Sequence, residues 1–599
     1  MGDEGNLDPG RMARRAGLAI AQGVLLWWLY EIAANDLWPA AQRGWLVGLI
    51  SAAALVPLAH YVIADLAPPA RQWLPLSALA LFLLALGWHY GAWTSNEPFD
   101  NLLPFAAPVV VLVFHALPFL QSALTRSRVR PRYEDLFRFA WRNALLGALS
   151  LLFAGVFWLL LLLWGELFQM LGIDFFHDLF EASAFAIPAT ALAVGIGARL
   201  AGSVERLQSA LRQQLLALLK WLAPLAMLIL VLFTAALLVK SPELFSEHRR
   251  AISAAWLLWL IALSVALLNA VYQDGHDDSP YPRWLGFLIR CATLLLLPVA
   301  LLAIYALWVR IDSYGFTVSR AWGLLVALVA LAYAGGYAWA AFGRGRWMAG
   351  MGQVNVAIAL FTIAMLTLML TPPLSPERLA AASQHRRALE DPAGDAYAYL
   401  RFESGRYGRE RLARLAQTGG PSGSSDIRAR AARELERDTR WEGEPASALA
   451  AAAFDVFPPG ATVEPALLAA LARAPDVGLQ GDCLPDYRCT LLFADLNRDD
   501  ALEAIVLSDT RATMATRALA GWRIVDSVWN MRPQRPGGGR DALRQAAEAG
   551  NYRIVDLPWQ AIEINGDYYA FTGSAPAAGR CADAKDAVTS EERAARVCP

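Results

Sequence analysis

The sequence predicts an α-helical polytopic membrane domain followed by a soluble α+β domain. Of the 599 residues, 56% are hydrophobic, 22 are Trp, and the formal net charge is −1. Long apolar segments recur as far as about residue 371, whereas charged helices and short β-branched segments follow them. A chain so apolar and so nearly neutral fits neither a nucleic-acid-binding protein nor a disordered polymer.

Each apolar segment is long enough to cross a hydrocarbon core of ~30 Å as a helix. We expect eleven spans, at residues 16–33, 44–65, 73–94, 101–122, 138–170, 180–202, 215–239, 250–273, 284–309, 320–342 and 354–371. The first follows three arginines, as the core of a signal peptide would. Bulky residues follow it in place of a small-residue cleavage site, so we interpret it as a retained helix after a short cytoplasmic segment, residues 1–15.

Arginine in the short loops indicates orientation, because positively charged loops stay in the cytoplasm. With the N-terminus inside, the inner loops include "TRSRVRPRYEDLFR" and "GRGRW", while the outer loops "TSNEPFDN" and "LGIDFFHDLFEAS" contain no Lys or Arg. The loops "KSPELFSEHRR" and "QDGHDDSPYPR" run against this pattern. An odd number of spans then predicts that the chain beyond residue 372 lies in the periplasm, if the membrane is the inner membrane of a Gram-negative bacterium.

The cysteines agree with an exported C-terminal part. Cys291 lies inside a span, whereas Cys483, Cys489, Cys581 and Cys598 all follow the last span. An even set in an exported domain is typical of disulfides. Of the three connectivities we favour Cys483–Cys489 with Cys581–Cys598, and four free thiols are the alternative. Neither pair has the close spacing of a zinc site.

We expect a soluble helical segment at 372–480. Ser375 followed by Pro376 is a typical helix start, with a capping hydroxyl and Pro at the first helical position. The stretch "TGGPSGSSD" at 418–426 predicts a flexible linker, and a further helix is expected at about 463–473.

Strands are expected in the last segment, 481–599, which we interpret as a small antiparallel α+β domain held by disulfides. The segments rich in β-branched and aromatic residues are "CTLLFA", "EAIVLS", "GWRIVDSVWN", "YRIVDL", "AIEI" and "YYAFTG". Asn565 and Gly566, between the last two, predict a two-residue hairpin turn, which needs positive φ at both positions.

Several stretches of the membrane half resemble the bacterial family known as domain of unknown function 4153. They are "FAWRNALLGALSLLFAGVFWLLLLLWGELFQMLGIDFF", "LLALLKWLAPLAMLILVLFTAALL", "AISAAWLLWLIALSVALLNAVYQDG" and "ALWVRIDSYGFTVSRAWGLLVALVALAYAGGYAWA", within residues 135–342. Their distinctive polar positions are Asn269, Arg310, Tyr314, Gly315 and Arg320, and Val318 stands where the family pattern has Pro after Thr317. The resemblance implies a polytopic inner-membrane protein and carries no activity.

Ionisable side chains inside a span are costly and are therefore candidates for function. His115 lies in mid-span, and Glu166, Asp174, His177 and Asp178 cluster towards the outer face. Such a cluster suits a proton relay, or a metal site with carboxylate and imidazole ligands. The alternative is that these residues lie in water at the interface and that His115 hydrogen-bonds a neighbouring helix.

An acidic loop between two predicted strands, "ADLNRDDALE", is a candidate calcium site. Asp495, Asn497 and Asp499 alternate as oxygen ligands of Ca²⁺ do, and Glu503 follows at position nine, although the loop lacks the Gly and the last Glu of an EF-hand. The alternative is an acidic turn in solvent. No phosphate loop, zinc-protease motif or nucleophile elbow occurs in the sequence.

These observations favour an inner-membrane protein that senses, scaffolds or binds in the envelope rather than an enzyme. The expected partners are the lipid bilayer and an envelope protein, with no nucleic acid, and Ca²⁺ is the one cofactor suggested. A secondary transporter using His115 and Glu166 is the alternative. An enzyme acting on envelope lipid or glycan through Glu166 and Asp174 is a further one.

Overall fold

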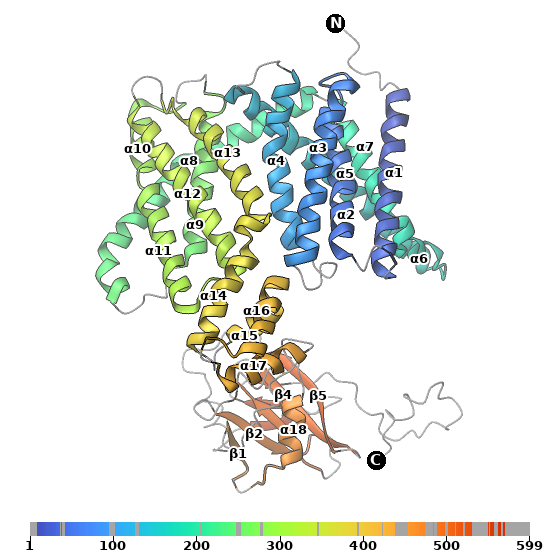
Figure 1. Ribbon diagram of the computed structural model, residues 1–599, viewed down its shortest axis with the longest axis vertical. Helices are drawn as coiled ribbons and strands as arrows, with labels where there is room; N and C mark the ends of the chain where they lie inside the picture. The colour runs from blue at the N-terminus through green and yellow to red at the C-terminus, as the bar shows by residue number, and fades with distance from the viewer. Residues whose placement is uncertain are drawn as a thin grey trace. The chain divides into compact units, whose positions relative to one another are not determined.

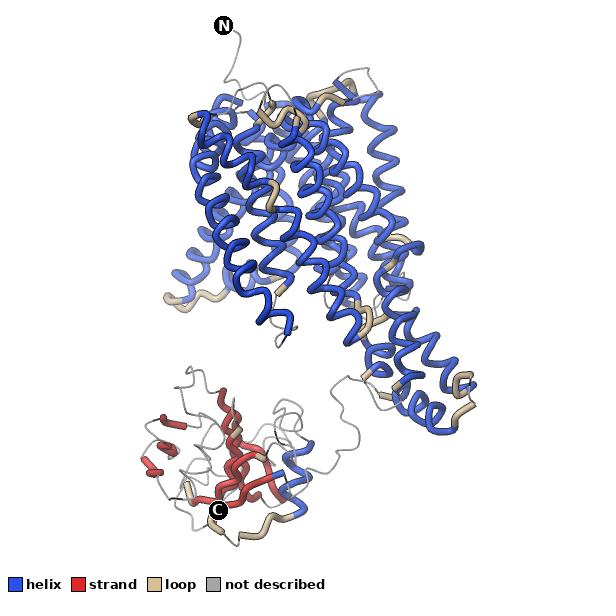
Figure 2. Tube along the Cα trace, turned by 90° about the vertical axis from the view of Figure 1, so that its left-hand side faces the viewer, coloured by secondary structure: helices blue, strands red, loops and turns tan. Residues whose placement is uncertain are grey.

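The chain folds into two compact units, which meet between Glu436 and Arg437. The computed structural model describes residues 9–35, 37–38, 42–94, 102–125, 131–203, 205–246, 253–275, 280–343, 347–391, 395–421, 423–437, 453–459, 461–473, 483, 488–496, 501–508, 511–518, 521–529, 549, 552–555, 561–564 and 567–569. The first unit is helical, and strands form most of the second (Figure 1, Figure 2).

Among the described residues, the first unit contains eleven helical segments that are long and apolar enough to span a membrane. This confirms the predicted number. Ten are single helices or a helix with a short extension: α1 (Pro9–Ala34), α2 (Arg43–Ile63), α3 with the π-helical turn η1 (Pro69–His89, Tyr90–Thr94), α4 (Leu103–Thr125), α5 (Tyr133–Gln169), α7 (Ser183–Ser203), α8 (Glu205–Ser246), α9 (Ala254–Tyr272), α12 (Val318–Phe342) and α13 (Met351–Met369). The short α6 (Phe175–Glu181) follows α5. These helices lie side by side in one bundle (Figure 1).

The ninth span is interrupted. It consists of α10 (Arg283–Thr293) and α11 (Leu296–Tyr314), separated by a turn at Leu294 and Leu295. Our sequence-based ranges did not anticipate the break, although Pro298 accounts for it. Proline has no amide hydrogen to donate to the Leu294 carbonyl, and its ring crowds that carbonyl. Apart from this break, the sequence-based ranges agree with the helices to within about five residues, except at α1, which begins earlier, and at α8, which extends beyond the expected 215–239 at both ends.

Small residues let the helices approach closely. In α2 and α3, the pairs Gly44, Gly48 and Gly87, Gly91 each have the G-x-x-x-G spacing that brings membrane helices together. A Cβ atom on Gly87 would lie 2.5 Å from the Cα of Gly48, which is backbone and cannot move aside. These glycines therefore set the distance between α2 and α3.

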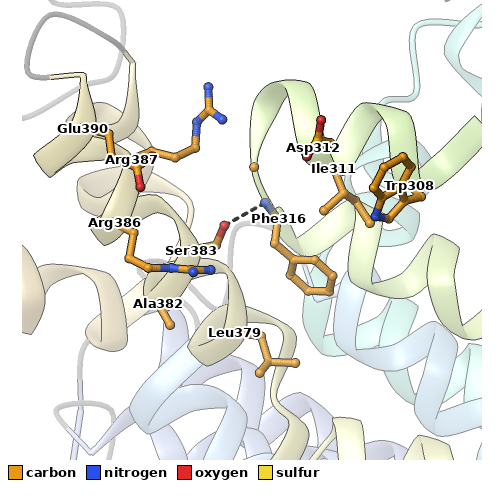
Figure 3. A pocket seen from close by; sticks show the side chains of 11 residues that line it. Trp308, Ile311, Asp312, Phe316, Leu379, Ala382, Ser383, Arg386, Arg387 and Glu390 are labelled. Carbon is orange, nitrogen blue, oxygen red and sulfur yellow. Dashed lines mark hydrogen bonds between the residues drawn. The ribbon is translucent and has the colours of Figure 1, made fainter. Parts of the chain in front are cut away.

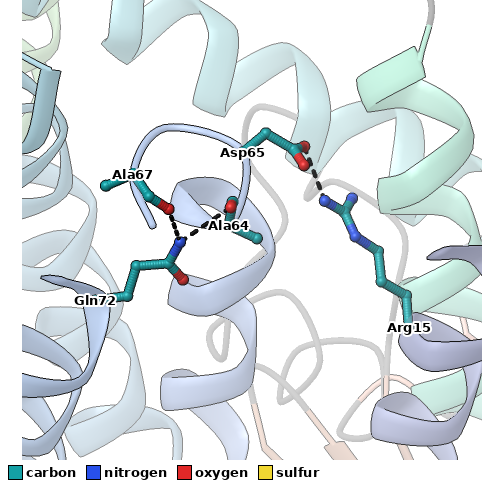
Figure 4. Close-up of polar contacts among 5 residues, drawn as sticks. All are labelled: Arg15, Ala64, Asp65, Ala67 and Gln72. Carbon is teal, nitrogen blue, oxygen red and sulfur yellow. Dashed lines mark hydrogen bonds and ion pairs between the residues drawn. The ribbon is translucent and has the colours of Figure 1, made fainter. Parts of the chain in front are cut away.

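Polar contacts join α1 to the turn between α2 and α3 (Figure 4). Arg15 forms an ion pair with Asp65 at 2.8 Å, and Gln72 donates to the carbonyl oxygens of Ala64 and Ala67. Because about half of the Asp65 side chain is exposed, this pair contributes little stability and mainly orients the turn.

Four helices after the last span belong to the first unit and lie at one end of the bundle (Figure 1). They are α14 (Pro376–Glu390), α15 (Ala396–Phe402), α16 (Gly405–Thr418) and α17 (Ser425–Glu436), preceded by the single turn η2 (Pro372–Leu374). Tyr397, Leu400 and Leu412 are fully buried in their common core. We refer to α14–α17 as the helical cap.

The division of the chain after the last span differs from our expectation of a soluble helical segment over 372–480. The predicted linker at 418–426 is the connection between α16 and α17, and Ile427 and Ala431 of α17 pack into the same core as Leu415. The residues after 437 join the sheet unit, because a strand at 454–457 pairs within it. The glycine and serine content of 418–426 predicted a flexible linker, but it does not reveal the apolar contacts that hold α16 and α17 together in the cap.

The start of α14 also differs in detail from our expectation. Pro376 is its first residue, as predicted, but the Ser375 hydroxyl does not cap the helix. It donates instead to the Glu377 carboxylate, with an O···O distance of 2.6 Å. The Ser375 hydroxyl therefore bonds to a carboxylate two residues later, a stronger acceptor, and does not accept from an amide at the start of the helix.

The second unit contains a five-stranded sheet in the order β1-β2-β3-β4-β5 and a three-stranded sheet. The strands are β1 (Phe454–Phe457), β2 (Cys489–Ala494), β3 (Glu503–Leu507), β4 (Arg511–Ala518), β5 (Gly521–Trp529), β6 (Tyr552–Val555), β7 (Ala561–Ile564) and β8 (Asp567–Tyr569). The helix α18 (Pro465–Arg473), predicted at 463–473, packs on β5. The six predicted strands are present.

Two strands of the larger sheet were not predicted. β4 reads "RATMATRA", which lacks the bulky β-branched and aromatic residues on which the prediction relied. β1 is short and pairs with β2 in parallel, so this sheet is mixed rather than purely antiparallel. In the smaller sheet Ile564 pairs with Asp567 across two residues, as the Asn565–Gly566 prediction requires, although the turn itself lies outside the described residues.

Candidate functional site

The turn between α11 and α12 carries the polar motif "SYGFTVSR" and is one of the places where the helical cap contacts the bundle. Gly315 ends α11 with φ +76°, a conformation that side chains other than glycine rarely adopt. Arg320 reaches back from α12, donating to the Gly315 carbonyl at 2.5 Å, and its guanidinium lies 5.4 Å from the centre of the Tyr314 ring. The motif is thus a rigid turn held by its own arginine.

Side chains of the cap complete the hydrogen bonding of this turn. The Phe316 amide donates to the Ser383 hydroxyl at 3.0 Å, and the Gln384 side chain donates to the Phe316 carbonyl at 3.1 Å. The Val318 amide donates to the Tyr399 hydroxyl at 2.8 Å. Burial raises the pKa of Tyr399 to about 12, partly offset by this hydrogen bond, so the phenol is neutral at physiological pH. Backbone groups that water would otherwise satisfy are therefore bound by the cap.

A pocket of about 670 Å³ lies beside this contact (Figure 3). α11 contributes Trp308, Ile311 and Asp312 to its lining, and α14 contributes the basic pair Arg386 and Arg387. Its size is within the ~300–1,000 Å³ of ordinary ligand sites. We refer to it as the junction pocket. The carboxylates of Asp312 and Glu390 line it together with the two guanidinium groups, so the pocket suits a ligand with both polar and apolar parts rather than a simple anion.

A second polar group lies inside the bundle and joins four spans. Asn355 of α13 donates to the Tyr133 hydroxyl of α5 at 3.1 Å and to the Asn269 side chain of α9 at 2.7 Å. Tyr337 of α12 is fully buried, donates to Asn355 at 2.8 Å and accepts from Asn269 at 2.6 Å. The network is closed, and it ties the ends of α5, α9, α12 and α13 together. Of the four residues in this network, only Asn269 is among the distinctive polar positions on which the family resemblance rests.

The intramembrane residue His115 does not contact a neighbouring helix through its ring nitrogen Nδ1. That atom lies 2.8 Å from the carbonyl oxygen of Val111, one turn earlier in α4. Through this atom the ring hydrogen-bonds to its own helix, and not to a neighbouring helix as in the alternative given above.

The predicted outer cluster is not drawn together into one site. Glu166, Asp174 and Asp178 are exposed, and the described contact of His177 is with Glu181, at 3.4 Å. Within the described part of the chain, no three His, Cys, Asp or Glu side chains lie close enough to hold a metal ion. The relay and metal hypotheses for this cluster gain no geometric support.

The acidic loop of the second unit is described in part, since Asn497 and Asp499 lie outside the described residues. Glu503 begins β3 and is fully buried. One carboxylate oxygen accepts from the Leu496 amide at 2.8 Å and the other from the Thr516 hydroxyl at 3.3 Å. Glu503 therefore closes the loop between β2 and β3, and its use as a calcium ligand stays a prediction.

A disulfide links Cys483 to Cys489, the first of the two predicted pairs. Cys581 and Cys598, the second pair, lie outside the described residues. Cys291 is a free thiol in α10.

The fold and these contacts define a class: a multi-pass integral membrane protein with extramembrane helices built onto its bundle. Within that class, the chain belongs to the family described as Domain of unknown function (DUF4153), which matches residues 19–413. The match is wider than the stretch 135–342 that carries the resemblance in the sequence. It runs from α1 into α16, so it includes most of the helical cap. Neither a curated protein nor a solved structure matches the chain.

Proposed function

We propose that the protein is a bacterial inner-membrane scaffold or sensor, in which the helical cap relays what binds at the junction pocket to the bundle. The observation that carries this proposal is the hydrogen bonding of the "YGFTVS" backbone by Ser383, Gln384 and Tyr399. A turn bonded in this way cannot shift without moving α14 and α15. A ligand in the junction pocket would therefore act on α11 and α14 at once.

The proposal places the N-terminus in the cytoplasm and the cap and C-terminal unit in the periplasm. The arginine-rich loops support this orientation. The Cys483–Cys489 disulfide also supports it, because such bonds persist in oxidising compartments. An envelope protein and the lipid bilayer are the partners we propose.

Topology is tested with reporters fused after residue 372 and after residue 599, one active only in the cytoplasm and one only in the periplasm. We expect periplasmic activity at both positions. Cytoplasmic activity at both would refute the orientation, and with it the envelope role.

The relay is tested by hydrogen exchange on the full-length protein in lipid discs. Ser383→Ala combined with Gln384→Leu removes three of the four hydrogen bonds between the cap and the turn and leaves the one from the Val318 amide to Tyr399. We expect faster exchange in residues 312–320 and 376–390. Arg428→Gln, at an exposed position on α17, is the control. Unchanged exchange in the double variant would show that the turn does not depend on the cap.

A secondary transporter is the second candidate, and one observation favours it. The ninth span is interrupted at Leu294 and Leu295, as spans that line a substrate path often are. Arg290, four residues earlier, has its Nε atom buried with no hydrogen-bond partner among the described residues. Flux through proteoliposomes that falls in Arg290→Gln but not in His115→Ala or Glu166→Gln would support transport through this break. An enzyme using Glu166 and Asp174 gains no such support.

A further inference from the structure

A second pocket, of about 360 Å³, lies where α2 begins, α3 and η1 end, and α16 passes over them. Its basic residues are Arg43, Arg406 and Arg409, and its aromatic residues are Trp45 and Trp88. We refer to it as the basic pocket. No acidic side chain of the described chain lines it. The junction pocket differs in this respect, because Asp312 and Glu390 line it together with its arginines.

Two glycines bring the walls of the basic pocket together. A Cβ atom on Gly91 would lie 2.8 Å from the Arg43 carbonyl oxygen, so η1 and the start of α2 are in backbone contact. Gly405 begins α16 with φ +57°, and a Cβ atom there would lie 2.4 Å from the Thr94 carbonyl oxygen. The arginines that follow Gly405 are thereby held close to Arg43.

Positive charge in the basic pocket is crowded and uncompensated at Arg409. This side chain is partly buried, and it forms no hydrogen bond or ion pair with the residues that the structure describes. Burial lowers the pKa of Arg409, and the nearby guanidinium groups of Arg401, Arg43 and Arg406 lower it further. Arg406 is held by Glu410, at 2.8 Å, on the exposed side of α16. A partly desolvated guanidinium with cationic neighbours is a site that attracts an anion.

The basic pocket lies at the depth of lipid headgroups. Trp45 and Trp88 are about half exposed, at 50% and 42%, and each is close to the end of a span. Tryptophan concentrates at this level of a membrane, where its ring meets acyl chains and its N–H meets water. Arg406 stacks on a third tryptophan, Trp93, 4.4 Å from its ring centre. The opening therefore faces headgroups rather than bulk solvent alone.

We propose that the basic pocket binds a phosphate group, supplied by the headgroup of an anionic phospholipid. Planar guanidinium groups bind phosphate oxygens in pairs, which favours phosphate over a spherical anion. The first turn of α2 lies beside them, and its Trp45 amide already donates to the Gln42 carbonyl at 2.9 Å, so the guanidinium groups are the donors we propose. Free phosphate shares this chemistry, so the test separates the two sources. The inference holds for either orientation of the membrane.

The test uses the full-length protein in lipid discs of phosphatidylcholine, with phosphatidylglycerol or inorganic phosphate added. We expect phosphatidylglycerol to raise the melting temperature of the wild-type protein. Arg409→Gln should weaken the apparent affinity roughly tenfold, as the loss of one charge-assisted hydrogen bond does. Arg433→Gln, at an exposed arginine of α17, is the matched control and should bind as the wild type does.

Each outcome decides the inference. An Arg409-dependent rise with phosphatidylglycerol supports a lipid ligand, and the same rise with inorganic phosphate supports the basic pocket with a soluble ligand. In pure phosphatidylcholine, Arg409→Gln should melt no lower than the wild type, because it removes repulsion between cations. If it melts much lower there, or binds as tightly as Arg433→Gln does, the proposal is refuted. Arg409→Lys keeps the charge without the planar fork and should bind with intermediate affinity.

Discussion

At the residue scale, the local sequence around a carboxylate does not identify its hydrogen-bond partner in this protein. Glu503 lies in an acidic run that resembles a metal loop, yet its two oxygens accept hydrogen bonds from Leu496 and Thr516. Glu377 follows a typical helix start, yet it takes the hydroxyl of Ser375. In both cases the partner is set by the fold, and residue type alone does not identify it.

Replacing Glu503 separates its structural use from calcium binding. We expect Glu503→Ala to lower the free energy of unfolding of the second unit by about 1–3 kcal/mol, because it leaves the buried Leu496 amide without an acceptor. Glu503→Gln keeps an acceptor oxygen and should lose much less. Chemical unfolding of the full-length protein, followed by hydrogen exchange within β2 and β3, measures both.

The same variants test the calcium prediction. If millimolar Ca²⁺ stabilises the wild type but neither Glu503→Gln nor Asp495→Ala, then Glu503 is a ligand and the acidic loop is a metal site. If Ca²⁺ has no effect on the wild type, the loop is an acidic turn.

Glu377 should make the stability of the helical cap depend on pH. Burial raises the pKa of its carboxyl group above the ordinary value, and the Ser375 hydrogen bond offsets part of the rise. The folded state then binds the proton more tightly than the unfolded state. Protonation of Glu377 therefore stabilises the folded cap. This stabilisation is complete below the unfolded-state pKa of ~4.3 and is lost as the pH rises through the raised folded-state pKa.

We therefore expect Glu377→Gln to flatten this decline. The melting temperature measured from about pH 4 to about pH 8 should fall less with rising pH in the variant than in the wild type. Glu436→Gln, at an exposed position at the end of α17, is the control. A decline that is equally steep in both variants would contradict the assignment to Glu377.

At the scale of helices and strands, close packing decides which spans are neighbours. Hydropathy locates the spans of this chain well, because each one must cover the same thickness of hydrocarbon. It says little about pairing, since all lipid-facing surfaces are similarly apolar. The glycine pairs of α2 and α3 carry that information, and so does the polar network centred on Asn355.

Gly87 tests the contact between α2 and α3. We expect Gly87→Ala to lower the free energy of unfolding by about 1–3 kcal/mol, because the new methyl group overlaps the backbone of Gly48. Gly147→Ala is the matched control, since a Cβ atom on Gly147 meets nothing within 4 Å. Thermal unfolding in detergent compares the two. Equal melting temperatures would show that α2 and α3 are not held at this distance.

At the scale of the whole molecule, the boundary of the first unit and the extent of the family match point to one conclusion. The unit ends at Glu436 and the match at residue 413, both well beyond the last span. The helical cap is therefore part of the membrane domain rather than a linker to the sheet unit. Its apolar core and its bonds to the "YGFTVS" turn are the physical reason.

Truncation separates these alternatives. A chain of residues 1–436 should keep the melting temperature of the first unit, because it retains every contact within that unit. A chain of residues 1–371 should be less stable, since it loses the partners of Phe316 and Val318. The comparison is made in one detergent by thermal unfolding. If both fragments melt alike, the cap does not stabilise the bundle.

The sequence by itself determined the class of the protein, its eleven spans, the family and the six strands that are rich in β-branched residues. These features depend on local composition and on the constant thickness of a bilayer, which any chain must match segment by segment. We did not anticipate the break at Leu294, although Pro298 signals it locally. The sequence did not reveal the strand "RATMATRA", the helical cap or the basic pocket. The cap and the pocket depend on residues far apart in the chain, such as Phe316 and Ser383, which hydrogen-bond, and Arg43 and Arg409, which line one pocket. Only the tertiary structure brings these residues together.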